Sequence, residues 1–100
     1  RDRKVLAEEG VVVVIVTIDH DDRTLVNGPE VITKGWVYAP EAEDLIDEME
    51  KVVGDQVRSA LERHDIEIES IQRTVRKAAG KFVSDRTKRR PMIVPVVMSL

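Results

Sequence analysis

The first strongly apolar segment of the chain directly follows Gly10. Residues 11–18 read Val-Val-Val-Val-Ile-Val-Thr-Ile. Because β-branched side chains fit a pleated strand and crowd a helix, this segment is predicted to be a strand. Both of its alternating faces are apolar, which is typical of a strand covered on both sides and predicts a central position in its sheet.

A second β-rich segment extends from Val31 to Tyr38. The polar stretch before it ends in Asn27-Gly28-Pro29, a turn signal, so the two segments are predicted to form a hairpin with a long loop. Gly35 interrupts the second strand. A glycine there indicates either a β-bulge or the close approach of another backbone, and the pattern does not choose between them.

The hydrophobic period changes to that of a helix after Pro40, which is followed by acidic residues as at a helix start. One apolar stripe runs to about residue 63, and Asp65 is a candidate cap for a second helix that ends near Lys88, before Pro91. The first stripe comprises Leu45, Ile46, Met49, Val52, Val53, Val57, Ala60 and Leu61, and the second Ile68, Ile71, Val75, Ala78, Ala79, Phe82 and Val83.

A last apolar segment, Met92 to Met98, contains Pro95, which has no N–H for a ladder hydrogen bond and therefore predicts an edge strand. The order is ββααβ. It predicts an α/β chain of the α+β two-layer sandwich type, with a three-stranded sheet and two antiparallel helices on one face. The whole chain, residues 1–100, is expected to be a single domain.

Two helices on one face leave the other face of the sheet uncovered. Because the first strand is apolar on both faces, the open face is expected to carry a contiguous apolar patch, and such patches usually mark an interface. The sequence does not show which face the helices cover. The residues expected at this interface are Val12, Val14, Val16, Met92, Val94, Val96 and Met98.

Composition limits the functional classes further. The chain is 42% apolar and 35% charged, which is typical of a folded globular domain. It has no cysteine, so disulfides and thiolate zinc sites are excluded, and a cytoplasmic location is expected. No apolar run is long enough to span a membrane. The charged start at Arg1, without methionine, suggests that the chain is a C-terminal piece of something longer.

Charge is distributed unevenly. Residues 1–72 carry a net charge of −10 and residues 73–100 a net charge of +7. The second helix thus has a basic face, with Arg73, Lys77 and Lys81 stacked at intervals of four and Arg76 beside them. This face is a candidate site for contact with nucleic-acid phosphates or with another subunit. The alternative is a solvated or intramolecular role, since cations favour a helix C-terminus and the acidic first helix is available to neutralise them.

Catalytic chemistry has little support in the sequence. Asp19-His20-Asp21-Asp22 contains metal-ligand types, but consecutive residues at a hairpin tip diverge, so we favour a solvated turn over a metal site. We interpret His64 as a solvated loop residue. The acidic run of the first helix is interpreted as a solvated face, and it comprises Glu41, Glu43, Asp44, Asp47, Glu48 and Glu50. We therefore predict no catalytic residue, metal ligand or cofactor in this segment.

Three segments carry a family resemblance. They are Glu8-Glu9-Gly10-Val11-Val12-Val13-Val14, the stretch Gly28-Pro29-Glu30-Val31-Ile32-Thr33-Lys34-Gly35-Trp36-Val37-Tyr38, and Lys88-Arg89-Arg90-Pro91-Met92-Ile93-Val94-Pro95-Val96-Val97-Met98. In order and spacing they resemble the C-terminal domain of bacterial ribonuclease J, over essentially the whole chain. The last segment is the most specific. Trp36 stands where phenylalanine is expected, a conservative change.

The resemblance implies a parent enzyme with a metallo-β-lactamase domain and an inserted β-CASP domain. Such an enzyme cleaves RNA endonucleolytically and in the 5′ to 3′ exonucleolytic direction with zinc-activated water. The metal-binding His-x-His-x-Asp-His motif has no counterpart among His20 and His64. The resemblance also implies that residues 1–9 connect to a missing N-terminal catalytic part. The implied role of this domain is to assemble a dimeric or tetrameric enzyme and support its catalytic body.

Three hypotheses follow. The first is an assembly module that docks on a second copy or on the catalytic domain of its own enzyme, with RNA reached through the full-length protein and no membrane contact. The second is an accessory RNA-binding module that contacts phosphates through Arg73, Arg76, Lys77 and Lys81. The third, which we favour least, is a free-standing metal hydrolase centred on His20, Asp21 and Asp22.

Overall fold

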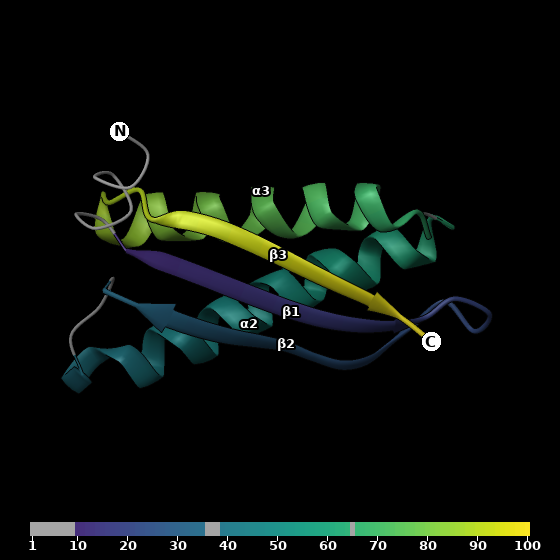
Figure 1. Ribbon diagram of the computed structural model, residues 1–100, viewed down its shortest axis with the longest axis horizontal. Coiled ribbons are helices and arrows are strands. Elements are labelled where there is room, and N and C mark those ends of the chain that lie inside the picture. Colours follow the sequence, from purple (N-terminus) through teal and green to yellow (C-terminus); the bar gives the residue numbers. More distant parts are fainter. Residues whose placement is uncertain (1–9, 36–38, 65) are drawn as a thin grey trace.

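The computed structural model describes residues 10–35, 39–64 and 66–100, with side chains of the first helix described from Glu43 onward. The elements are strands β1 (Val11–Asp19) and β2 (Thr24–Lys34), helices α2 (Ala39–Glu62) and α3 (Ile68–Thr87), and strand β3 (Met92–Ser99) (Figure 1). The predicted order ββααβ and the α+β class are confirmed.

The sheet has the strand order β2-β1-β3, with β1 antiparallel to β2 and parallel to β3. The central position of β1 and the edge position of β3 are therefore as predicted. The backbone N–H of Met92 donates to Gly10 and that of Leu100 to Ile18, at 3.0 and 2.9 Å. Even-numbered N–H groups of β3 thus point toward β1. Pro95 falls on the alternate set, which faces the free edge and needs no ladder hydrogen bond.

Both helices cover the same face of the sheet (Figure 1). The even-numbered residues of β1 point into this layer, and Val12, Val14, Val16 and Ile18 are all 0% exposed. They pack with the apolar stripes of the helices in one core, which also includes Met49, Val53, Val57, Ala60, Leu61, Ile71, Val75, Ala79, Phe82 and Val83.

This burial corrects one sequence expectation. Val12, Val14 and Val16 were assigned to an exposed interface, but the helices cover them completely. A side chain without accessible surface makes no contact with another chain, so these three residues belong to the core. The uncovered face of β1 is the odd-numbered one.

The hairpin between β1 and β2 is shorter than the sequence suggested. Its turn lies at residues 20–23, where the carboxylate Oδ1 of Asp19 accepts hydrogen bonds from the backbone N–H groups of Asp21 and Asp22, both at 3.0 Å. This turn, held by the side chain of Asp19, closes the hairpin before the expected turn at Asn27-Gly28-Pro29. Asn27-Gly28-Pro29 instead lies within β2, next to the irregularities of register. The strand ends at Lys34, and Trp36–Tyr38 lie outside the described residues.

Gly35 follows β2 and approaches Gly10 closely. A Cβ atom added to Gly10, which has φ +87°, would lie 2.6 Å from the carbonyl carbon of Gly35. The crowding therefore restricts position 10, whereas a Cβ atom at Gly35 would lie 3.6 Å from Gly10 Cα, an ordinary contact, and the φ of +74° is what favours glycine at position 35. The contact joins the start of β1 to the end of β2 and leaves no room for a side chain at Gly10.

The helices agree with the predicted stripes except at their ends and at Val52, which is 39% exposed. Helix α3 begins after Glu67, whose side chain makes no capping hydrogen bond, and the proposed cap Asp65 lies outside the described residues. The helix ends at Thr87 and is capped by Lys88, which has φ 60° and donates its N–H to the carbonyl oxygen of Ser84, and Pro91 follows as predicted. No helix in the described part of the chain combines the length and apolar character needed to cross a membrane.

Candidate interaction surfaces

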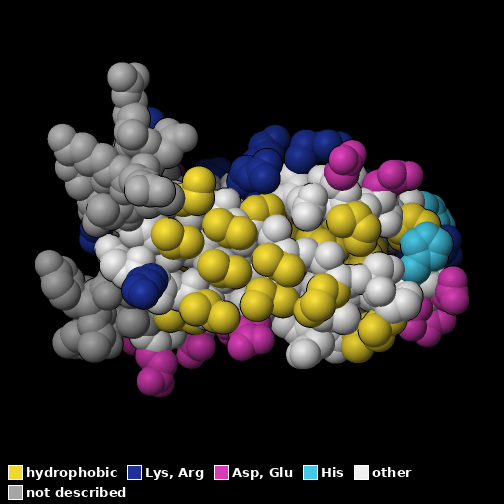
Figure 2. All heavy atoms as spheres, viewed as in Figure 1, with side chains coloured by type: hydrophobic (Ala, Val, Ile, Leu, Met, Phe, Trp, Pro, Cys, Tyr) yellow, Lys and Arg dark blue, Asp and Glu magenta, His cyan; other side chains and the backbone are white. Residues whose placement is uncertain are grey.

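The outer face of the sheet, opposite the helices, is apolar. Register pairs Val11 with Met92, Val13 with Val94, and Ile15 with Val96 across β1 and β3. On the other side of β1, Val13 pairs with Ile32 of β2. Paired residues project to the same face. We call the face that carries these pairs the outer sheet face, and Figure 2 shows its apolar side chains as a broad patch.

The side chains of the outer sheet face are more exposed to solvent than those of the core. Ile32, Met92 and Met98 are 50%, 47% and 49% exposed, and the residues of β1 and β3 between them are half-buried. Four of the expected interface residues lie here, namely Met92, Val94, Val96 and Met98. Sequence reasoning missed Val11, Val13, Ile15 and Ile32. Thr17 was the available signal, because its hydroxyl marks the odd-numbered face of β1 as the one nearer solvent.

Both edges of the sheet are hindered from pairing with a further strand. On β2, the N–H of Val31 donates to the carboxylate Oε2 of Glu50 in α2 at 3.0 Å. On β3, Pro95 presents no donor at the free edge. Glu50 therefore caps an edge strand, in contrast to its interpretation as part of a solvated acidic face. A partner has better access to the outer sheet face than to either edge.

The loop 19–22 shows no convergence of ligands. Asp19 uses one carboxylate oxygen within its own turn, and His20 Nδ1 lies 3.5 Å from the carboxylate of Asp21. His64 is an exposed turn residue with φ 65°. Among the described residues, no three histidine, aspartate or glutamate side chains form a group suited to a metal ion. The described residues of this loop and turn therefore offer no set of side chains that fits a zinc ion.

The basic face of α3 is partly neutralised within the chain. Lys81 Nζ pairs with Asp85 at 2.9 Å, and Arg86 pairs with Glu48 of α2 at 2.8 Å while its guanidinium lies 5.2 Å from the centre of the Phe82 ring. The hydrogen bond from Arg86 lowers the pKa of Glu48 below its ordinary value, and the same bond raises the pKa of Arg86.

All four cations of this basic face are exposed, and Arg73, Arg76 and Lys77 differ from Lys81 in their ion pairing. No ion pair joins any of these three to a carboxylate in the described ranges. Of the four residues expected to contact RNA, Lys81 is thus the one engaged by a neighbouring acid. The structure brings the four together on one exposed helix surface.

Comparison with known proteins gives a consistent result. A family model described as "Ribonuclease J C-terminal domain" matches residues 1–100. The chain is 38% identical over 100 residues to "Ribonuclease J2" of Bacillus subtilis strain 168, and 40% identical to "Ribonuclease J 2" of Staphylococcus aureus strains NCTC 8325 and N315. Each match covers 100% of this chain and 18% of the relative. The chain therefore belongs to the ribonuclease J C-terminal domain family.

Proposed function

We propose that this domain assembles and supports a ribonuclease J-like enzyme by docking its outer sheet face on a second copy or on the catalytic body. The single observation that carries the proposal is the apolar face itself, on which Ile32, Met92 and Met98 are each about half exposed. A soluble chain rarely leaves such a contiguous patch in water unless another surface covers it.

The activity of the whole enzyme is proposed from the resemblance. The relatives are named as ribonucleases, and we propose RNA processing and decay by endonucleolytic and 5′ to 3′ exonucleolytic hydrolysis in the cytoplasm. Zinc would supply an activated water for that reaction. Its ligands are proposed to lie in the catalytic part, because the described histidines and carboxylates do not gather into a site here. This domain would hold that part in its assembled form.

The test places a charge on the outer sheet face of the whole enzyme. Val13→Asp introduces a carboxylate at the centre of the patch. Ile68→Asp is the control, since Ile68 is an exposed apolar residue in the first turn of α3, where the helix dipole favours an acid. Light scattering would give the mass of the assembly, and the rate of RNA degradation its activity.

The proposal expects Val13→Asp to lower the assembled mass or detach the catalytic part, with a fall in activity, whereas Ile68→Asp changes neither. If the Val13→Asp enzyme keeps the mass and activity of the unmodified enzyme, the outer sheet face is not its assembly surface.

A second candidate function is RNA binding by the basic face of α3. Three exposed cations without an ion pair to a described carboxylate favour it. Binding of single-stranded RNA through three or four phosphates would fall with salt at a logarithmic slope of about −2 to −3. Charge reversal at Lys77 and Lys81 should then abolish retention on immobilised RNA. Absence of retention by the unmodified domain at low salt would exclude this function.

A further inference from the structure

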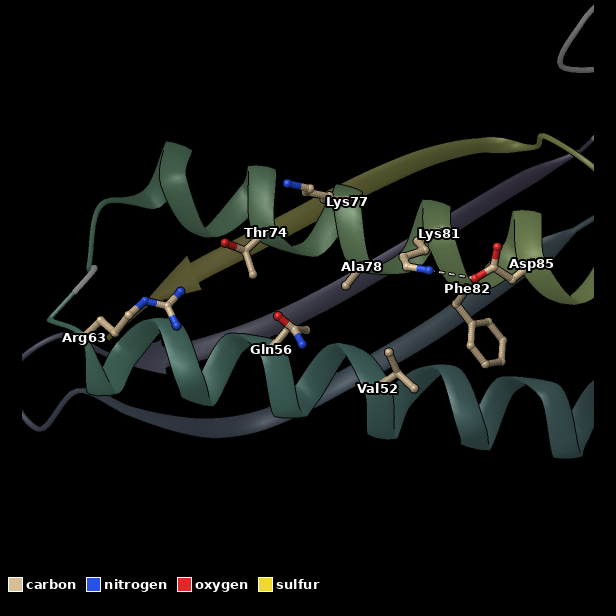
Figure 3. A pocket seen from close by; sticks show the side chains of 9 residues that line it. All are labelled: Val52, Gln56, Arg63, Thr74, Lys77, Ala78, Lys81, Phe82 and Asp85. Carbon is tan, nitrogen blue, oxygen red and sulfur yellow. Dashed lines mark hydrogen bonds and ion pairs between the residues drawn. The ribbon is translucent and has the colours of Figure 1, made fainter.

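A groove of about 570 Å³ separates α2 from α3 on the helix layer. Figure 3 shows the strands behind both helices, so the groove opens away from the sheet. The lining residues are Val52, Gln56 and Arg63 of α2 and its exit turn, with Thr74, Lys77, Ala78, Lys81, Phe82 and Asp85 of α3. This interhelical groove is thus on the opposite side of the domain from the outer sheet face.

The floor of the interhelical groove is apolar near Phe82, whereas Gln56 and Thr74 line the groove nearer Arg63 (Figure 3). Val52 is 39% exposed although it belongs to the apolar stripe of α2, and Ala78 and Phe82 line the groove across from it. Phe82 is only 9% exposed, and Arg86 lies over its ring. The ring is therefore poorly placed to stack on a nucleic-acid base. The floor suits aliphatic side chains.

The rim of the interhelical groove is basic. Arg63, Lys77 and Lys81 line it with a single acid, Asp85, which pairs with Lys81 at 2.9 Å. Arg63 and Lys77 are exposed and form no ion pair with a described carboxylate. The chain as a whole has a net charge of −3, so this positive rim is a local exception. An apolar floor below a basic rim complements a ligand that carries both aliphatic groups and carboxylates.

We propose that the interhelical groove binds an acidic amphipathic peptide segment of a separate protein. The lining residues of α3 extend from Thr74 to Asp85, a length of about 16 Å, which matches about three turns of a bound helix. Aliphatic side chains of the segment would contact Val52 and Phe82, and its carboxylates would contact Arg63 and Lys77. A partner of the outer sheet face would leave this groove open, so the two surfaces can be occupied together.

The experiment uses a fluorescein-labelled peptide of about eleven residues, with leucines along one helical face and glutamates beside them. Fluorescence anisotropy would measure its affinity for the 100-residue chain. Lys77→Glu should weaken binding at least about tenfold, because it replaces an attraction by a repulsion. Val52→Ser should weaken binding severalfold by removing apolar contact. Both residues are exposed, and circular dichroism would verify that each variant is folded.

Arg76→Glu is the matched control, since Arg76 is the neighbouring exposed cation of α3 but does not line the groove. It should leave peptide affinity within about twofold. Equal weakening by Lys77→Glu and Arg76→Glu, with none by Val52→Ser, would show a general basic surface for polyanions such as RNA and overturn the proposal. Self-association that displaces the peptide, or no binding at ~100 µM, would also overturn it.

Discussion

The two faces of the central strand β1 carry nearly the same residue types but differ in solvent exposure. Val12, Val14 and Val16 are 0% exposed beneath the helices, whereas their neighbours Val11, Val13 and Ile15 remain half-buried on the outer sheet face. Because all six side chains are β-branched and aliphatic, their chemistry does not explain this difference in exposure. The difference comes from the helices, which hold one face as core and leave the other available to a partner.

The largest effect that tests this comparison is a buried charge. Val14→Asp should lower the free energy of unfolding by at least about 3 kcal/mol, because a carboxylate in the core has no partner. Val13→Asp, one residue away on the outer sheet face, should cost about 1 kcal/mol, since its carboxylate reaches solvent. Urea denaturation followed by circular dichroism would measure both values.

A pair of milder substitutions, to alanine, makes the same comparison if the Val14→Asp variant does not fold. Val14→Ala should cost about 2 kcal/mol and Val13→Ala less than about 1 kcal/mol. Equal losses at the two positions would mean that the faces are not distinct, and would remove the basis for assigning the outer sheet face to a partner.

A smaller effect concerns the edge of the sheet at β2, where Glu50 accepts the N–H of Val31. Glu50→Ala leaves the N–H of the buried residue Val31 without its acceptor and should cost about 1 kcal/mol, whereas Glu50→Gln keeps an oxygen acceptor and should cost less. Asp47→Ala, an exposed acid on the same helix, is the control. Thermal unfolding would rank the three variants. A loss at Asp47 as large as that at Glu50 would refute the capping role.

The smallest effect lies in the helix layer, in the ion pair of Glu48 and Arg86. Because the pKa of Glu48 in the folded chain is below its ordinary value of 4.5, the pair stabilises the fold above that pH. This stabilisation should be lost as pH falls below 4.5 through the lowered pKa. Both side chains are about half exposed, so the effect is small and screened by salt.

Glu48→Gln isolates this contribution, since glutamine has no carboxylate to titrate. The midpoint of thermal unfolding should fall less steeply between pH 4.5 and pH 3 in Glu48→Gln than in the unmodified chain, and the difference should shrink in high salt. Parallel pH profiles for the two proteins would contradict the assignment.

Hydrophobic period predicted the elements of the fold and the positions of β1 and β3. The apolar stripes defined the helices, and Pro95 identified the edge strand because its missing donor is tolerated only there. The start of β2 was not predicted. The turn that closes the hairpin depends on a single carboxylate, Asp19, whereas Asn27-Gly28-Pro29 has the composition of a turn but occupies an irregular part of the strand.

The candidate surfaces were predicted only in part. An open apolar face was predicted because two helices on one side of a sheet leave the other side uncovered. Which residues of β1 lie on that open face depends on which face the helices cover. The sequence does not decide this, because both faces of β1 are valine-rich. The sequence contains no pattern that predicts the interhelical groove, because Val52 belongs to the apolar stripe and would be expected in the core, yet it is exposed. Its geometry arises from the packing of two helices, which hydrophobic period does not specify.

The most direct measurement of the assembly surface is the oxidation of the methionines in the assembled enzyme. Met92 and Met98 lie on the outer sheet face at 47% and 49% exposure, whereas Met49 is 0% exposed in the core and serves as an internal control. Peroxide oxidation followed by mass spectrometry would compare the isolated domain at low concentration with the whole enzyme. The account predicts that assembly slows oxidation of Met92 and Met98 and leaves Met49 unreactive in both states. Equal oxidation of Met92 and Met98 in the two states would contradict it.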